Sequence, residues 1–246
     1  MSTSTKDFIN KLSELKKEFK VFIPSIKKEV TAKQITLKQQ KDIISTAVNG
    51  VLGALQFNKA VNELIIENVD SDTLFTFDRV PALLALRVES LGDKIKIDDG
   101  EIVSLKDSLL KAREVPPFKL TKKVKIGSIN VELRIPTLKE ENIILKKCIQ
   151  EIDNLKSENL SEAMGLIYIF ELIKTIKSIE VEEELIDFNE LKVVDRVKIV
   201  EQLPLELYDD ITSFLTKVAK FEEGILTVNE SIIPIDASLL DATTSA

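Results

Sequence analysis

The most regular feature of the sequence is an alternation of apolar and polar positions over residues 118–135. A period of two residues is typical of a β-strand that buries one face. Gly127-Ser128 divides this segment into two halves, and a glycine in this place favours a two-residue turn between antiparallel strands. The pattern therefore predicts a central β-hairpin over residues 118–135.

Elsewhere, apolar residues mostly recur at intervals of three and four, which is the spacing of an amphipathic helix. Thr36 with Gln39, and Thr137 with Glu140, match the capping box with which many helices begin. We expect helices over residues 36–48, 52–68, 79–91, 104–112, 137–155, 161–176, 190–202 and 205–222, the last of them stopped by Gly224. Short strands are expected over 28–35 and 94–97, a partly strand-like segment over 178–186, and a small C-terminal hairpin from 225–228 and 232–235. The predicted fold class is α+β, and mostly helical.

Both ends of the chain carry apolar residues that are candidates for binding a partner. Spacings of four, three and four predict one apolar stripe on a helix over residues 6–20. The members of that stripe are Phe8, Leu12, Leu15 and Phe19. A terminal helix of this length is marginal alone, so we expect it to dock on its own domain or on a neighbouring subunit. We also expect that deletion of residues 1–20 leaves a folded core and weakens assembly.

Near the C-terminus, three isoleucines surround Pro234 within residues 225–240. They are Ile232, Ile233 and Ile235. Such an apolar segment is able to extend the sheet edge of a neighbour. The tail from Asp236 onward is expected to be frayed or to serve as a docking strand.

Pro116-Pro117 is the clearest interruption of the chain. It suggests an N-terminal mixed region over 1–115 and a second region over 116–246, or one integrated domain containing both. The charge is divided at a different place, because residues 1–150 have a net charge of +6 and residues 151–246 of −13. Two interpretations stay open: the two regions meet different neighbours, or one soluble protein has a basic and an acidic surface.

The composition excludes most catalytic chemistry. The chain has no histidine, so triads with histidine and His/Cys zinc sites are impossible. Its seven glycines form no phosphate-binding loop. The sequence Asp98-Asp99-Gly100-Glu101 lacks the spacing of a calcium loop and reads as a turn. We expect no cofactor, no metal site and no enzymatic activity.

Cys148 is the only cysteine, which excludes an internal disulfide and fits a reducing cytoplasm. Neighbouring lysines would lower the pKa of its thiol, but no histidine is present as an activating base, so a buried structural thiol is the favoured interpretation. No signal peptide or membrane span is visible, since the apolar stretch over residues 164–173 is too short to cross a bilayer.

Four lysines over residues 119–125 offer a possible contact to nucleic acid. Few aromatic side chains are available to stack on bases, because the chain has two tyrosines and no tryptophan. Lysines on the outer face of an edge strand also protect it from aggregation. A nucleic-acid-binding regulator that uses the hairpin is therefore an alternative hypothesis.

Four segments, taken in order, resemble one family. They are Ile23-Pro24-Ser25 followed by the helix start over 33–41, the Asp-led helix from Phe77-Asp78-Arg79 to Gly92, the strand-to-helix junction Ile129–Thr137, and an acidic helical segment from Phe188 to Phe214. In this order they resemble the baseplate hub and hub-assembly proteins of T-even-like contractile-tail phages, over residues 20–220.

The resemblance implies a non-enzymatic structural component that forms or completes the central hub of a phage tail baseplate. It also implies contacts with other baseplate, hub and tail-tube proteins, an oligomeric assembly, and a location in the host cytoplasm during assembly and then in the virion. An assembly chaperone that is absent from the mature virion is the alternative within the family. Many relatives carry Cys pairs suggestive of zinc loops, whereas this chain has no Cys in residues 93–117 or 224–246, so no metal is expected.

Arg87 lies in the helix that shows this resemblance. Two roles are open for it. Its guanidinium satisfies buried carbonyl or carboxylate groups, or it contacts a partner.

Overall fold

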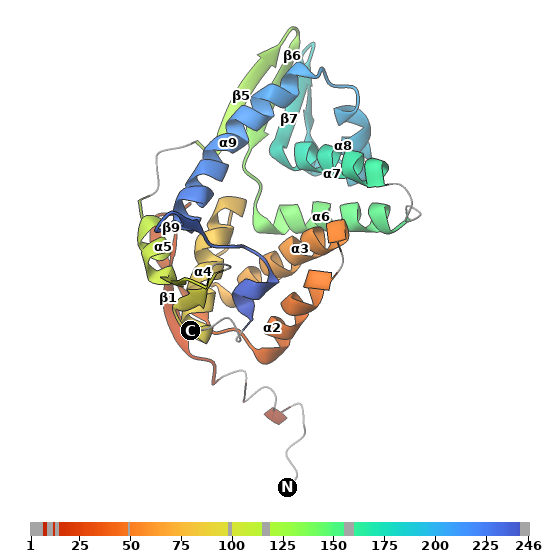
Figure 1. Cartoon of the computed structure of the whole chain (residues 1–246). Coiled ribbons are helices and arrows are strands. Elements are labelled where there is room, and N and C mark those ends of the chain that lie inside the picture. The colour runs from red at the N-terminus through yellow and green to blue at the C-terminus, as the bar shows by residue number, and fades with distance from the viewer. Residues whose placement is uncertain are drawn as a thin grey trace.

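The structure, a computed structural model, describes residues 7–8, 12, 15–48, 50–97, 100–114, 119–154 and 160–241. Helices and short antiparallel sheets follow one another along the chain, so the predicted α+β class is confirmed (Figure 1). The helices are α2 (Leu37–Ile44), α3 (Gly50–Asn68), α4 (Arg79–Leu91), α5 (Leu105–Lys111), α6 (Leu138–Asn154), α7 (Leu160–Thr175), α8 (Val193–Val200) and α9 (Glu206–Leu226). Short 3-10 helices are η1 (Ser45–Val48), η2 (Thr76–Asp78), η3 (Phe188–Glu190) and η4 (Ala237–Leu240).

The predicted central hairpin is confirmed as β5 (Thr121–Ile126) and β6 (Ile129–Arg134). Its expected first residue, Phe118, lies outside the described residues. Gly127 has a φ of 58°, which is the left-handed conformation that the first turn position requires.

The hairpin is half of a larger sheet. Strands β7 (Ile176–Val181) and β8 (Glu184–Asp187) extend it to four antiparallel strands in the order β5-β6-β7-β8. The segment 178–186 is therefore two strands, where the sequence indicated only partial strand character. The sequence signal was weak because Glu182 and Glu183 form the turn with φ values of 50° and 72°, where glycine or asparagine is usual.

The three remaining sheets are two-stranded. They pair β1 (Glu18–Ile23) with β2 (Lys28–Lys33), β3 (Lys94–Lys96) with β4 (Ile102–Ser104), and β9 (Thr227–Val228) with β10 (Ser231–Ile232). The predicted strands near 28–35 and 94–97 and the small C-terminal hairpin are thus confirmed. The two aspartates of the turn predicted at Asp98-Asp99-Gly100 lie outside the described residues. The Pro116-Pro117 interruption lies outside them too.

The expected N-terminal helix over 6–20 is wrong in its last part, because Glu18–Ile23 is strand β1. Phe19, Val21 and Ile23 alternate along this strand, and Val21 and Ile23 are buried in the core. Pairing with β2 buries this alternating face, which outweighs the weaker helical spacing that ends at Phe19.

Two expectations about the C-terminus are also wrong. Helix α9 continues through Gly224 to Leu226, since an isolated glycine lowers helix stability without ending a helix whose apolar face is buried. Residues 237–240 of the tail are neither frayed nor a docking strand, because they form η4, in which Leu239 and Leu240 are completely buried, while residues 242–246 lie outside the described residues.

Buried apolar side chains from both halves of the chain form one connected cluster. Helix α6 lies against α3, and α9 contacts α4, α5 and β5, so helices of the second half pack on those of the first (Figure 1). The four-stranded sheet lies at the end of the molecule opposite α2 (Figure 1).

Candidate functional site

Arg87 is completely buried, so it is not a surface contact as its partner-binding interpretation required. Its Nε donates to the Leu239 carbonyl at 2.7 Å and its Nη1 donates to the Gly92 carbonyl at 2.6 Å. Burial lowers the pKa of the guanidinium, but arginine starts from so high a value that it stays charged. The structural role is therefore the one observed: Arg87 joins the C-terminal 3-10 helix η4 to the end of α4.

The three C-terminal isoleucines lie in different environments. Only Ile232 is largely exposed, at 64% of its surface. Ile233 is buried and its N–H donates to the Leu226 carbonyl at 2.9 Å, while Ile235 packs partly buried against the core. Because two of them complete this protein's own core, they do not form the single adhesive segment that the sequence suggested.

The four N-terminal candidates also differ in how exposed they are. Phe8, Leu12 and Leu15 are each more than half exposed, whereas Phe19 lies in β1 and packs against the core. The first three remain candidates for a partner contact, and Phe19 belongs to the protein's own hydrophobic cluster.

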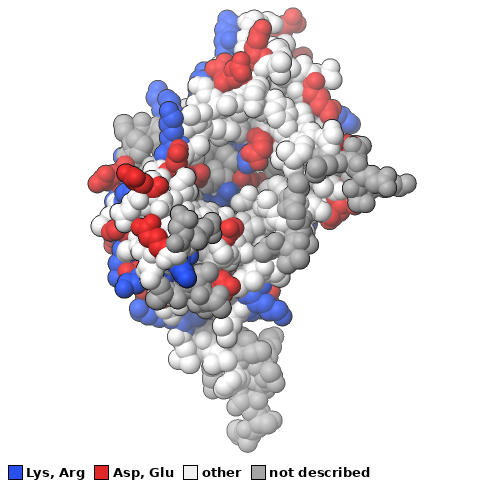
Figure 2. Space-filling view, viewed as in Figure 1, with Lys and Arg blue, Asp and Glu red and all other residues white. Residues whose placement is uncertain are grey.

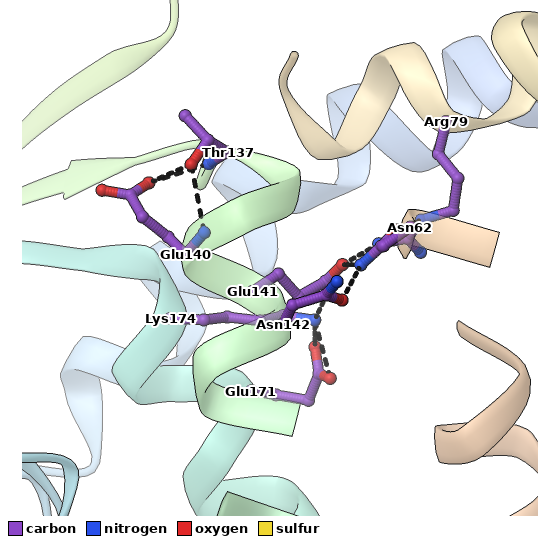
Figure 3. A network of polar contacts seen from close by, with 8 residues as sticks. All are labelled: Asn62, Arg79, Thr137, Glu140, Glu141, Asn142, Glu171 and Lys174. Atoms are coloured by element: carbon purple, nitrogen blue, oxygen red, sulfur yellow. Dashed lines mark hydrogen bonds and ion pairs between the residues drawn. The ribbon is translucent and has the colours of Figure 1, made fainter. Parts of the chain in front are cut away.

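A buried polar network joins four helices, α3, α4, α6 and α7 (Figure 3). Glu141 on α6 is 3% exposed and binds three groups. Asn62 Nδ2 on α3 donates to it at 2.8 Å, Lys174 Nζ on α7 lies at 3.0 Å, and Arg79 at the start of α4 forms an ion pair with it. Lys174 also reaches Glu171 on its own helix, at 2.6 Å.

The electrostatics of this network balance cations against carboxylates. Burial lowers the pKa values of Arg79 and Lys174, while Glu171 and Glu222 raise them again. Burial raises the pKa of Glu222 on α9, and the two cations oppose that rise. Glu141 and Glu171 are thus each held in an ion pair, which suits these two carboxylates to holding helices together.

Asp78 is a second buried carboxylate. It stands at the N-cap position of α4, yet its side chain does not cap that helix. It accepts the Ser25 N–H at 2.9 Å and the Phe75 N–H at 2.8 Å instead. Burial raises the pKa of Asp78 to about 6, although these hydrogen bonds act in the opposite direction. Asp78 therefore fixes the β1–β2 turn to the start of α4.

The remaining candidates for chemistry are the Cys148 thiol and side chains that could bind a metal ion. Burial, together with Glu171, raises the pKa of the Cys148 thiol to about 12, so the thiol is protonated and structural. In the described ranges, no three His, Cys, Asp or Glu side chains gather closely enough to hold a metal ion. None of the helices in the described part of the chain is both long and apolar enough to cross a membrane.

The basic hairpin presents lysines together with acidic residues. Lys123 lies opposite Glu132 in the register, and the open cavity of about 460 Å³ on this sheet face is also lined by Glu180. Lys122 is engaged by Asp210 on α9 at 2.6 Å. Figure 2 shows the same mixture of signs over the visible face of the molecule. A mixed surface fits a phosphate backbone poorly.

Sequence reasoning missed an apolar groove between α7 and the start of α9. Its cavity of about 170 Å³ is lined by Tyr168, Leu172, Leu205 and Tyr208, among others. The rings of Tyr168 and Tyr208 lie 5.0 Å apart, and Leu205 is 79% exposed. The available signal in the sequence was Leu203-Pro204-Leu205, an apolar segment between two helices in which Leu203 packs against the core and Leu205 does not.

One comparison with known proteins identifies a family. A family model described as T4 bacteriophage base plate protein matches residues 16–229. This range contains the buried network, the four-stranded sheet and the apolar groove. No curated protein and no solved structure matches the chain.

Proposed function

Because the chain belongs to the family of T4 bacteriophage base plate proteins, we propose that it forms or completes the central hub of a contractile phage tail without enzymatic activity. The observation that carries this proposal is the family match over most of the chain. The structure supports a non-enzymatic role, since the buried carboxylates of Glu141 and Glu171 hold helices together through ion pairs. Function then depends on surfaces that bind other baseplate proteins.

The exposed surfaces support assembly by interface burial. The exposed apolar residues Phe8, Leu12 and Leu15 precede β1 in the chain, and the groove beside Leu205 is a separate apolar surface. Exposed apolar clusters of this kind are typical of protein–protein contacts. A stable contact in the hub should bury more than about 1,000 Å² in total.

The test is the presence of the protein in purified particles. We expect mass spectrometry of purified virions to detect it, and antibody labelling to place it at the baseplate. Presence in hub intermediates together with absence from mature particles would identify the alternative, an assembly chaperone. Absence from both would overturn the proposal. Samples from early and late infection, purified through a tag, separate these outcomes.

The nucleic-acid hypothesis keeps one supporting observation, the exposed lysines of β5, such as Lys123 and Lys125. It requires binding that weakens steeply with salt, because released counterions drive such binding. A low-salt gel shift with single- and double-stranded DNA tests it directly. We expect no retardation, because Glu132 and Glu180 share the same sheet face.

A further inference from the structure

The four-stranded sheet ends in two edges of opposite charge. β5 forms one edge and β8 the other, and within the described part of the chain no further strand pairs with either of them. Residues 119–125, on and next to β5, include four lysines and no acidic residue. Residues 180–187, which end in β8, include five acidic residues and no basic one. The two edges are therefore electrostatically complementary to each other.

These charges are largely uncompensated within the molecule. Lys119, Lys123 and Lys125 are exposed, and among the described residues none of them has an ion-pair partner. The same holds for the exposed carboxylates over residues 182–184. Lys122 is the exception, since it is paired with Asp210. Both kinds of charge are visible at the sheet end of the molecule in Figure 2.

The β8 edge is also apolar. Leu185 is 68% exposed and Ile186 is more than a third exposed, as is Val181 at the end of the neighbouring strand β7. An edge strand presents unpaired backbone N–H and C=O groups to any strand that approaches it. Apolar side chains beside unpaired backbone groups are the features that strand addition uses.

From this arrangement we propose that β8 of one copy pairs with β5 of a second copy of this chain, so that the sheet continues from copy to copy. Strands β5 and β8 run in opposite directions, because every neighbouring pair in the sheet is antiparallel. A second copy in the same orientation therefore adds an antiparallel strand. If the rows of the sheet continue without a shift, Asp187 lies opposite Lys123 on the outer face.

The inferred contact is heterologous, since it joins two different edges. Such contacts generate closed rings when the rotation between copies closes, and open chains when it does not. This inference deepens the proposed assembly role, on which it rests, by naming one partner as a second copy of the chain. Its test uses purified protein, whereas the proposed function is tested on virions, so the two can fail separately.

The experiment is a charge exchange followed by sedimentation velocity at low and high salt. The full-length protein is expected to self-associate, and less so at high salt, because exposed charges are screened. Lys123→Glu with Lys125→Glu, and separately Glu184→Lys with Asp187→Lys, should each weaken association by about tenfold or more, because like charges then lie along the two edges that meet. An equimolar mixture of the two variants should associate again, since each supplies the edge that the other needs.

The matched control is Lys28→Glu with Lys41→Glu. It changes the net charge by the same amount as the β5 variant, at exposed lysines outside the four-stranded sheet. It should leave association unchanged, and circular dichroism should show that all variants are folded. A wild-type protein that is monomeric at low salt over a wide concentration range overturns the proposal. The proposal is also overturned if either charge variant associates as strongly as the wild type. Failure of the mixed variants to associate overturns it as well.

Discussion

At the scale of single residues, two buried charged side chains hold backbone groups that are distant in sequence. Arg87 joins the end of α4 to η4, and Asp78 joins the start of α4 to the β1–β2 turn. Both side chains lie at the ends of one helix, which is itself buried along most of its length. The position of α4 therefore depends on a few polar contacts in addition to its apolar packing.

Replacement of Arg87 should test the contact with η4. We expect Arg87→Met to lower the free energy of unfolding by about 2–4 kcal/mol, because the buried Leu239 carbonyl and the partly buried contact to the Gly92 carbonyl lose a charged donor. Arg87→Lys should recover only part of this loss, since an ammonium cannot reproduce the geometry of the guanidinium. Urea denaturation gives the free energies. Hydrogen exchange should show faster opening of η4, and an unchanged rate there would contradict the assigned role.

Asp78 should make stability depend on pH. Its pKa is raised to about 6 from an unfolded value of 3.8, so the folded state holds its proton more tightly. The resulting stability is fully present below pH 3.8 and is lost as the pH rises through about 6. The advantage of the wild type over Asp78→Asn should therefore shrink between pH 4 and 7, by on the order of 3 kcal/mol. Denaturation curves at several pH values measure this difference, and a constant difference would argue against a raised pKa.

At the scale of elements, the buried network couples helices α3, α4, α6 and α7. Glu141→Gln removes the charge that faces both Arg79 and Lys174, so we expect a loss of about 3–5 kcal/mol in the free energy of unfolding. Glu151→Gln on the same helix is the matched control. Its pair with Lys147 is partly exposed, and its loss should cost less than about 1 kcal/mol. Similar costs for the two variants in urea denaturation would show that burial adds nothing to the ion pair.

The same network marks the limit of what the sequence reveals about elements. Capping boxes and apolar spacing located the helices and the central hairpin, because these signals are local. Asn62 and Glu141 are 79 residues apart, and no local pattern indicates that they meet. The glutamates of the β7–β8 turn were also misleading, since acidic residues normally indicate solvated loops and not left-handed turn positions. For the same reason the sequence drew attention to Arg87 but did not indicate the distant Leu239 carbonyl that its guanidinium binds.

At the scale of the whole molecule, the N-terminal residues differ from the body that follows them. Deletion of residues 1–15 should change the free energy of unfolding by less than about 1 kcal/mol, because Phe8, Leu12 and Leu15 are exposed. Deletion of residues 1–20 should cost several times more, since it removes half of β1 together with Phe19. Thermal melts compare the two truncations. If deletion of residues 1–15 abolished cooperative unfolding, these residues would belong to the core. A virion assay then measures the effect of this deletion on assembly.

The bond from Arg87 to the Leu239 carbonyl also has a consequence for synthesis on the ribosome. The two residues are 152 positions apart, and Gln40 reaches the Leu240 carbonyl across 200. During translation, α4 emerges long before the segment that satisfies its buried guanidinium. The N-terminal helices cannot reach their final packing until residues 237–240 have left the exit tunnel. Chains that stop early lack this contact, so they remain incompletely folded and exposed to proteolysis before they can compete for a place in an assembling particle.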